Sequence, residues 1–339
     1  MLDRLGAPRE PTSATTLEHP MSQDPVSNSA RSADLCRGMP EPDSPNSLPD
    51  FRRMLSALGV ENFFADYWQR QSVATRLAEA DLAQILEEIG ALDIARFAGT
   101  ARQGTRAWVA NEYVAHSVIP VDDQNAKKLF DIGATIYFVD VPLERLTNGL
   151  ADFLGAPRQK IIASIFLTPF SGGASPHFDR NENFTVQLTG RKQWTVSNIP
   201  MVAAPPDGYV LGQPIPPSLK TLLDPAMEPP CRIIDMQAGT MLYVPRGTVH
   251  HTSAGETSWS LNLSYTPSMW IDLIRAGLQR RLMSSSRWRG TISGVADTCD
   301  VAARQSNILN ELIAEMQAML SDPAEVHQLC KDFFNQPDG

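Results

Sequence analysis

The chain has 339 residues, of which 42% are hydrophobic and 20% charged, as in ordinary globular proteins. Its net charge of −9 and the lack of a basic block exclude a nucleic-acid backbone as the main partner, because binding phosphates requires clustered lysines and arginines. No apolar run is long enough to span a bilayer, no signal-peptide core is present, and the cysteines form no CxxC pair. We therefore expect a cytoplasmic protein with no membrane partner.

The first 49 residues are rich in Pro, Ser, Asp and Arg and contain few aromatic side chains. Such a segment cannot bury enough apolar surface to offset its ordering entropy, so we expect residues 1–49 to form a disordered tail. Apolar residues with helical spacing follow in residues 51–58 and 80–90, and Gly90 is suited to a helix end. A further helix is expected at residues 143–155, where a glycine again marks the end.

Between about residues 105 and 265 the pattern changes to short runs rich in β-branched and aromatic residues, separated by Gly and Pro. These runs predict strands, and they read ATIYFVDV, KIIASIFLTPF, NFTVQL, KQWTVSN, CRIIDM, GTMLYVP and WSLNLSYT. Many short strands with turn signals predict a mainly β fold with helical additions. The expected architecture is a sandwich or barrel of the jelly-roll or cupin kind.

Helical spacing returns after Pro267 and continues towards the C-terminus. The residues that form an apolar stripe there are Leu309, Leu312, Ile313, Met316 and Leu320. One-sided stripes of this kind either pair with a second copy of the chain or cover the barrel of their own chain.

The stretch SPHFDRNENFTVQL, residues 175–188, alternates polar and mostly apolar side chains. Alternation with period two indicates β-structure whose polar side chains share a face. The last predicted strand has the same property, with Ser260, Asn262 and Ser264 placed between apolar residues. In a barrel that encloses a ligand a polar face marks a site, whereas in an ordinary amphipathic strand it faces solvent.

Metal chemistry favours a site. His177 and Asp179 would leave a strand on the same side, and an imidazole beside a carboxylate suits a divalent first-row metal. A third ligand is expected from VPRGTVHHT, residues 244–252, where a Pro-Arg-Gly turn precedes His250 and His251. Neighbouring strand residues point opposite ways, so only one of these two histidines can be a ligand. Two histidines and one carboxylate form the facial triad of non-haem Fe(II) oxygenases.

Such an iron needs a co-substrate that supplies two electrons to dioxygen. 2-Oxoglutarate would chelate the metal, and its far carboxylate requires a cation. Lys192 is well placed because it lies just past a turn expected at residues 189–191. The returning strand would hold Lys192 beside the metal strand, whereas Arg191 would point the other way.

The segments IFLTPFSGGASPHFD, NFTVQLTGRKQW and GTMLYVPRGTVHHT resemble segments of the JmjC branch of the Fe(II)/2-oxoglutarate oxygenases, and within it the cupin-like ribosomal oxygenases. FFADYWQRQ and SMWIDLIRAGL are similar to the segments that precede the barrel and open the helical dimerisation region in that family. The resemblance covers roughly residues 50 to 290. It implies a double-stranded β-helix core in a catalytic domain at 50–268 with N-terminal helices, followed by a helical region at 269–339 that forms a homodimer.

The resemblance also implies roles for individual residues. It gives His250 the place of the third iron ligand beside His177 and Asp179, and it makes Lys192 the residue that binds the 2-oxoglutarate carboxylate. The implied cofactors are Fe(II), 2-oxoglutarate and dioxygen, with no catalytic residue beyond the metal centre.

Three further polar residues are expected around the co-substrate. Asn262 and Ser264 match positions that touch it in family members. Asn183 lies in an N-F-x-x-Q pattern similar to that of the asparaginyl hydroxylase of hypoxia signalling.

Four side chains near these motifs are expected to take no part in the chemistry. Glu182 and Asp235 are expected to be solvated carboxylates, and Trp194 and Trp259 are expected to face outwards from the barrel.

The expected function is hydroxylation of a protein or peptide side chain. Two features differ from the family: its usual C-terminal winged-helix domain would be shortened or absent, and Phe166 stands where many relatives have an aromatic hydroxyl. The shortened C-terminus and the acidic charge make a tailoring hydroxylase of a small molecule or biosynthetic peptide an alternative. A lysine demethylase is disfavoured because no histone-reading or zinc-binding segment is evident, and a non-catalytic metal-binding cupin is disfavoured by Lys192 and the complete triad.

Overall fold

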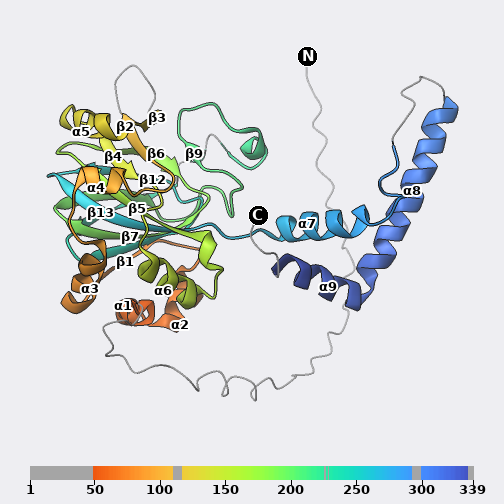
Figure 1. Cartoon of the computed structure of the whole chain (residues 1–339), viewed down its shortest axis with the longest axis horizontal. Coiled ribbons are helices and arrows are strands. Elements are labelled where there is room, and N and C mark those ends of the chain that lie inside the picture. The colour runs from red at the N-terminus through yellow and green to blue at the C-terminus, as the bar shows by residue number, and fades with distance from the viewer. Residues whose placement is uncertain (1–48, 110–116, 225–226, 228, 292–298, 335–339) are drawn as a thin grey trace, which may run out of the picture. The chain divides into compact units, whose positions relative to one another are not determined.

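The computed structural model describes residues 49–109, 117–224, 227, 229–291 and 299–334. Residues 1–48, nearly all of the expected tail, lie outside this part of the chain, so their disorder stays a prediction. Two antiparallel sheets with helices around them make up the core, which confirms the mainly β fold with helical additions (Figure 1). No helix in the described ranges is long and apolar enough to cross a membrane.

The larger sheet has eight strands in the order β1-β11-β7-β13-β5-β4-β2-β3. They are Val73–Arg76 (β1), Thr105–Val109 (β2), Ser117–Val121 (β3), Thr135–Phe138 (β4), Ile161–Thr168 (β5), Glu182–Thr189 (β7), Thr240–Val244 (β11) and Ser258–Tyr265 (β13). The last strand of the chain, β13, lies between β7 and β5, so residues far apart in sequence share its two edges.

The smaller sheet has five strands in the order β10-β8-β12-β6-β9. They are Gly173–Phe178 (β6), Arg191–Ser197 (β8), Tyr209–Val210 (β9), Cys231–Gln237 (β10) and His250–Ala254 (β12). The runs predicted as strands correspond to β4, β5, β7, β8, β10, β11 and β13, so each is confirmed. The larger sheet also gains β1, β2 and β3, which the sequence patterns did not single out.

Helices lie in the four regions where the sequence predicted them. The helices are Phe51–Met54 (α1), Val60–Asn62 (α2), Glu79–Ile89 (α3), Ile94–Ala98 (α4), Asp123–Asp131 (α5), Glu144–Leu154 (α6), Trp270–Met283 (α7), Cys299–Ser321 (α8) and Pro323–Phe334 (α9). Of these, α4 and α5 are further helices that the sequence did not single out. A short π-helix, Phe63–Tyr67, follows α2. Gly155 ends α6 in the left-handed conformation, with φ of +61°, which a residue without a Cβ adopts at little cost.

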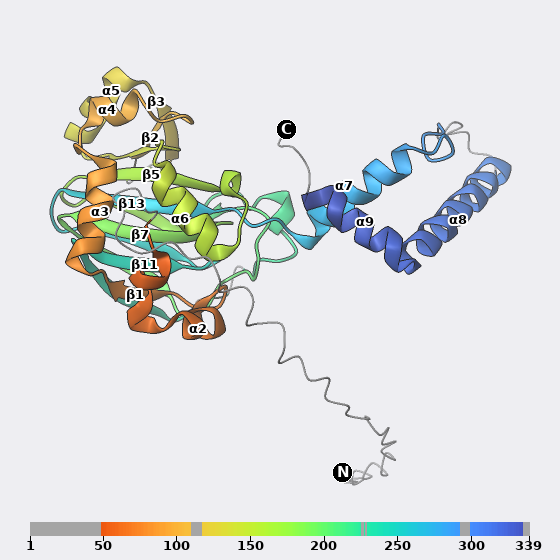
Figure 2. The same ribbon diagram turned by 60° about the horizontal axis from the view of Figure 1, so that its bottom comes forward.

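The outward face of the larger sheet is apolar and lies beneath helices. Side chains alternate along a strand, so β5 points Ala163 and Ile165 outwards into the main core, and β7 does the same with Phe184. Helix α6 adds Leu146 and Leu150 to this core, and Figure 2 shows α3 and α6 in front of the sheet. The inward faces of the same strands are thereby left for polar residues.

The polar alternation over residues 177–187 belongs to two strands in different sheets. Strand β6 ends at Phe178, and β7 begins at Glu182 in the larger sheet, because Asp179 to Asn181 form a connection between them. The strand that carries Lys192 was expected to pair with the strand that carries His177, and this was wrong. The chain crosses between sheets again after β7, and β8 pairs with β12 and β10 rather than with β6.

Gly190 makes the second crossing possible. Its φ is +69°, and a Cβ there would lie 2.4 Å from the carbonyl oxygen of Thr257. Gly212 also has a positive φ, of +87°, but a Cβ there would meet nothing within 4 Å.

We expect Gly190→Ala to lower the free energy of unfolding by more than about 2 kcal/mol, because it adds a steric clash to the cost of a left-handed alanine. Gly212→Ala has only the conformational cost and should lower it by about 1 kcal/mol. Urea unfolding of both variants measures the difference. If both variants lost the same stability, the close packing of Gly190 at the crossing after β7 would not be required.

Candidate metal centre and its pocket

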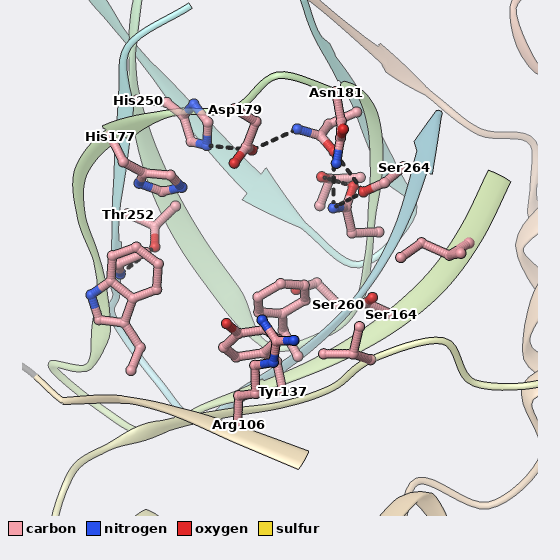
Figure 3. A pocket seen from close by; sticks show the side chains of 18 of the residues that line it. Arg106, Tyr137, Ser164, His177, Asp179, Asn181, His250, Thr252, Ser260 and Ser264 are labelled. Carbon is pink, nitrogen blue, oxygen red and sulfur yellow. Dashed lines mark hydrogen bonds and ion pairs between the residues drawn. The ribbon is translucent and has the colours of Figure 1, made fainter. Parts of the chain in front are cut away.

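A cavity of about 600 Å³ is lined by residues from both sheets (Figure 3). The inward faces of β5 and β13 provide one wall, because the residues between their outward-pointing neighbours face this space. The lining residues from these two strands are Ile162, Ser164, Phe166, Thr168, Ser260, Asn262 and Ser264. The polar ladder on the last strand therefore faces an enclosed site and not bulk solvent.

Two imidazoles and one carboxylate cluster in this cavity. One ligand atom from each of His177, Asp179 and His250 can be chosen so that all lie within 4.8 Å of one another. His250 Nε2 lies 3.7 Å from Asp179 Oδ2, and the ring centroids of the two histidines are 4.2 Å apart. The structure thus brings together the three residues that the sequence singled out, whereas His251 is outside the cluster.

Backbone pairing produces this convergence. His177 on β6 and His250 on β12 are direct antiparallel partners. The backbone N–H of Gly247 donates to the carbonyl oxygen of Asp179 over 2.8 Å, which joins the turn before β12 to the residue after β6. Gly247 has φ of +78°, and a Cβ there would lie 1.9 Å from the carbonyl oxygen of Val202, so this turn requires glycine.

Both histidines are held in the tautomer that a metal ligand needs. His177 Nδ1 lies 2.6 Å from the carbonyl oxygen of Ser175, and His250 Nδ1 lies 2.9 Å from that of Thr248. A carbonyl can only accept, so each Nδ1 carries the proton and each Nε2 keeps its lone pair. Burial and the neighbouring His177 lower the pKa of His250 to about 4, so this imidazole is neutral at pH 7.

A set of polar side chains supports the carboxylate. Asn183 Nδ2 donates to Asp179 Oδ2 over 2.7 Å. Asn183 Oδ1 accepts from Ser264 Oγ over 2.8 Å and from Asn262 Nδ2 over 3.2 Å. The three residues expected around a co-substrate thus form one network that orients Asp179, and their contact with 2-oxoglutarate stays a prediction.

Two indoles flank the imidazoles. The Trp108 ring centroid lies 4.8 Å from that of His177, and the Trp194 ring stacks on His250 with 5.3 Å between centroids. The outward position expected for Trp194 was wrong, since this residue lines the cavity at the same face of β8 as Lys192. Trp259 does face outwards, where it contacts Phe97.

Lys192 lies inside the cavity wall and is only 4% exposed. Its Nζ donates to Ser260 Oγ over 3.1 Å and lies 6.0 Å from the Phe166 ring centroid. No ion pair joins this lysine to any carboxylate of the described ranges. Burial without a charged partner lowers the pKa of Lys192 from 10.5 to about 7.

Glu182 was expected to be a solvated carboxylate, and this was wrong. It is 0% exposed, accepts a hydrogen bond of 2.7 Å from the Tyr243 hydroxyl, and forms an ion pair of 3.2 Å with Arg246. Burial raises the pKa of Glu182, while Tyr243 and Arg246 lower it. Its side chain leaves β7 on the face opposite to that of Asn183, so it supports the core and not the cavity. Asp235 is exposed as expected.

The sequence did not single out Arg106 and Tyr137, which also line the cavity. They are direct partners on β2 and β4, and Tyr137 is the direct partner of Phe166 on β5. The Tyr137 and Phe166 rings stack with 4.9 Å between centroids and 7° between planes. A tyrosine hydroxyl therefore lies next to the position where Phe166 lacks one. No local pattern could have revealed it, because the contact depends on which strands pair.

The comparisons with known proteins agree with this architecture. Residues 144–273 match the JmjC domain. The chain is 32% identical over 133 residues to the uncharacterized protein YxbC of Bacillus subtilis, covering 38% of this chain and 40% of that protein. It is 23% identical over 318 residues to ribosomal oxygenase 2 of Rattus norvegicus, covering 81% of this chain and 61% of that protein. The chain thus spans less than two thirds of either relative.

A solved structure of YcfD, a ribosomal oxygenase from Escherichia coli, in complex with cobalt and 2-oxoglutarate has the same fold. The TM-score is 0.50 at 17% identity, over 81% of this chain and 70% of that one. This likeness confirms the expected jelly-roll architecture with flanking helices. The matched JmjC domain at residues 144–273 contains the converging His-x-Asp and His residues, and the chain is similar to ribosomal oxygenases over part of their length.

Proposed function

We propose that this chain is an Fe(II)- and 2-oxoglutarate-dependent oxygenase that hydroxylates a protein or peptide side chain. One observation carries the proposal: two histidines whose Nδ1 atoms are bonded to backbone carbonyls, a carboxylate and a buried lysine without an acidic partner share one cavity. The first three groups suit a divalent first-row metal, and the lysine suits an organic anion.

The donor set fits ferrous iron. His177, Asp179 and His250 would hold the metal as a two-histidine, one-carboxylate triad, which leaves coordination positions for other ligands. The carbonyls of Ser175 and Thr248 hold the two rings in place. When bound with 2-oxoglutarate and dioxygen, ferrous iron supplies an oxidant that converts a substrate C–H bond to C–OH, while 2-oxoglutarate becomes succinate and carbon dioxide.

Lys192 fits the far carboxylate of 2-oxoglutarate. A buried ammonium with a single hydroxyl partner is costly, and an incoming carboxylate would supply the missing negative charge. The carboxylate would raise the pKa of Lys192 and keep it charged at neutral pH. Asn183, Asn262 and Ser264 would border the co-substrate while they orient Asp179.

The rest of the cavity would control access to the metal. Trp108, Trp194 and Phe166 provide apolar surface that excludes water around the polar centre. The substrate class is carried over from relatives that are named ribosomal oxygenases, which supports a protein or peptide. A hydroxylated small molecule would instead identify a tailoring enzyme.

We also propose a division into a tail at 1–49, a catalytic domain at 50–268 and a helical dimerisation region at 269–339. The apolar stripe on α8 supports the homodimer, because Leu309 is 55% exposed and Ile313 is 36% exposed in the single chain. The cytoplasmic location stays a prediction.

Replacement of His250 tests the metal site. We expect His250→Ala to weaken Co(II) or Fe(II) binding by about 100-fold or more, since one of three ligands is lost. Formation of succinate from 2-oxoglutarate and the gain of one oxygen by a substrate in cell extract, followed by mass spectrometry, should both disappear. His251→Ala is the matched control and should retain both activities. Metal binding that survives in the His250 variant would refute the site.

Replacement of Lys192 tests the co-substrate site through pH. Since burial lowers the folded-state pKa from 10.5 to about 7, this group destabilises the fold fully below pH 7, and the penalty disappears as pH rises to 10.5. We expect Lys192→Met to raise the free energy of unfolding by about 2–4 kcal/mol at pH 6 and by little at pH 10.5, while 2-oxoglutarate binding is lost.

Urea unfolding at both pH values and titration with 2-oxoglutarate measure these effects. Lys220→Met, at an exposed lysine, is the control and should show neither. A Lys192→Met variant that binds 2-oxoglutarate as the parent does would count against the assignment.

A charge on the stripe of α8 tests the homodimer. We expect Ile313→Asp to convert the dimer into a monomer in light scattering coupled to size exclusion, because it places a carboxylate in an apolar interface. Ala318→Asp lies on the opposite side of the same helix and should leave the dimer intact. A parent chain that already runs as a monomer would rule out the dimer.

A further inference from the structure

We propose that the substrate presents a carboxylate to Arg106 and Tyr137, on the cavity wall across from the metal cluster. This inference rests on the proposed function and names the chemical class of its substrate. It follows from the excess of basic side chains in the cavity lining, from their lack of ion pairs with carboxylates, and from the position of Arg106 beside Tyr137.

The described lining of the cavity is strongly cationic. Asp179 is its one acidic side chain, whereas Arg106, Lys160, Arg180 and Lys192 are basic. The proposed function uses Asp179 for the metal and Lys192 for the co-substrate. Three basic residues of the lining remain for the substrate. They are Arg106 on β2, Lys160 just before β5 and Arg180 just after β6.

These three cations lack acidic partners although the chain has a net charge of −9. Nearby arginines outside the cavity are paired: Arg102 with Glu144, and Arg158 with Asp152. Within the described ranges, no ion pair joins Arg106, Lys160 or Arg180 to a carboxylate. An acidic chain that leaves its pocket cations unpaired creates a positive potential there, which attracts anions and repels cationic side chains.

The backbone of Arg106 is fixed by strand pairing between β2 and β4, and its side chain is exposed at the cavity. The side chain interacts with the Tyr137 hydroxyl, whose ring stacks on Phe166 across the next strand pair. The guanidinium can only donate, so the hydroxyl oxygen accepts and its own proton remains free. Figure 3 shows both side chains across the cavity from His177, Asp179 and His250.

Arg106 thus offers only donors to the cavity, and Tyr137 offers the free proton of its hydroxyl. Burial raises the pKa of Tyr137, so this hydroxyl keeps its proton at neutral pH. A planar guanidinium beside a phenolic O–H matches the acceptor-only oxygens of a carboxylate. A lysine or arginine side chain would instead meet the like charge of Arg106, which has no acceptor to offer.

The test uses the full chain and three hexapeptide pools that differ only at one central position, which is Asp or Glu, Asn or Gln, or Lys or Arg. Binding to the metal-free chain is followed by tryptophan fluorescence. Stimulation of succinate formation is followed in the iron-loaded chain. We expect the acidic pool to bind about tenfold more tightly than the amide pool, and the basic pool to bind most weakly.

Variants at Arg106 give the decisive comparison. Arg106→Gln should remove the preference for acidic peptides, and Arg106→Glu should reverse it towards the basic pool. Arg102→Gln, an exposed arginine outside the cavity, should behave as the parent. Free N-acetylglutamate that binds as tightly as the acidic pool would identify a small carboxylic acid as the source of the group, whereas weaker binding would identify an acidic peptide.

Three results would overturn the inference: no charge preference, a preference for the basic pool, or an Arg106→Gln variant that loses 2-oxoglutarate binding as strongly as acidic-peptide binding. The last would assign Arg106 to the co-substrate. Conversion of 2-oxoglutarate to succinate without any peptide reports on the proposed function separately. A chain that turns over 2-oxoglutarate without preferring acidic peptides refutes only this inference. A chain that prefers them through Arg106 without such turnover refutes only the oxygenase.

Discussion

The pairing of β12 with β6 is the constraint on which the site depends. It sets His250 directly opposite His177, and the hydrogen bond from Gly247 N–H to the Asp179 carbonyl brings the carboxylate to the same place. Direct antiparallel partners keep their side chains within contact distance of each other. His250, more than seventy residues further along the chain, therefore converges with His177 and Asp179 through backbone geometry, before any metal contributes its own binding energy.

Hydrogen bonds to His177, His250 and Asp179 set the tautomer and the orientation of these three side chains. Backbone carbonyls of Ser175 and Thr248 select the tautomer of each imidazole, and Asn183 orients Asp179. Asn183 is fixed in place because its strand, β7, packs its outward face into the core through Phe184. The alternation of the strands thus links core packing to ligand orientation, since each outward apolar residue fixes the direction of an inward polar one.

The burial of the Lys192 ammonium in the cavity wall destabilises the fold, and an anionic ligand would offset this cost. Lys192 is buried with a hydroxyl as its partner, and the remaining described cations of the lining lack acidic partners. A site that is destabilising when empty and complementary when filled gains specificity for anions, because a neutral or cationic molecule cannot offset the desolvation of the ammonium. Both proposed ligands are carboxylates: 2-oxoglutarate would bind Lys192, and the acidic substrate would bind Arg106 and Tyr137 in the same cavity.

The sequence by itself determined the local features of this protein. Period-two alternation identified the inner strands and the polar face of β13, and glycines marked the ends of α3 and α6. The spacing of His177 and Asp179 identified two candidate metal ligands, and the resemblance to a family selected His250 over His251 as the third. The alternation, the helix ends and the His-x-Asp spacing depend on neighbouring residues along the chain, whose side-chain directions follow from backbone geometry alone.

Only the tertiary structure decided which strands are neighbours. It divided the polar run after His177 between two sheets, turned Trp194 towards His250 and buried Glu182 in the core. It also stacked Tyr137 on Phe166 and thereby positioned Arg106. Strand pairing joins residues distant in sequence and results from the packing of the whole core, so no local pattern specifies which face of a strand meets the cavity.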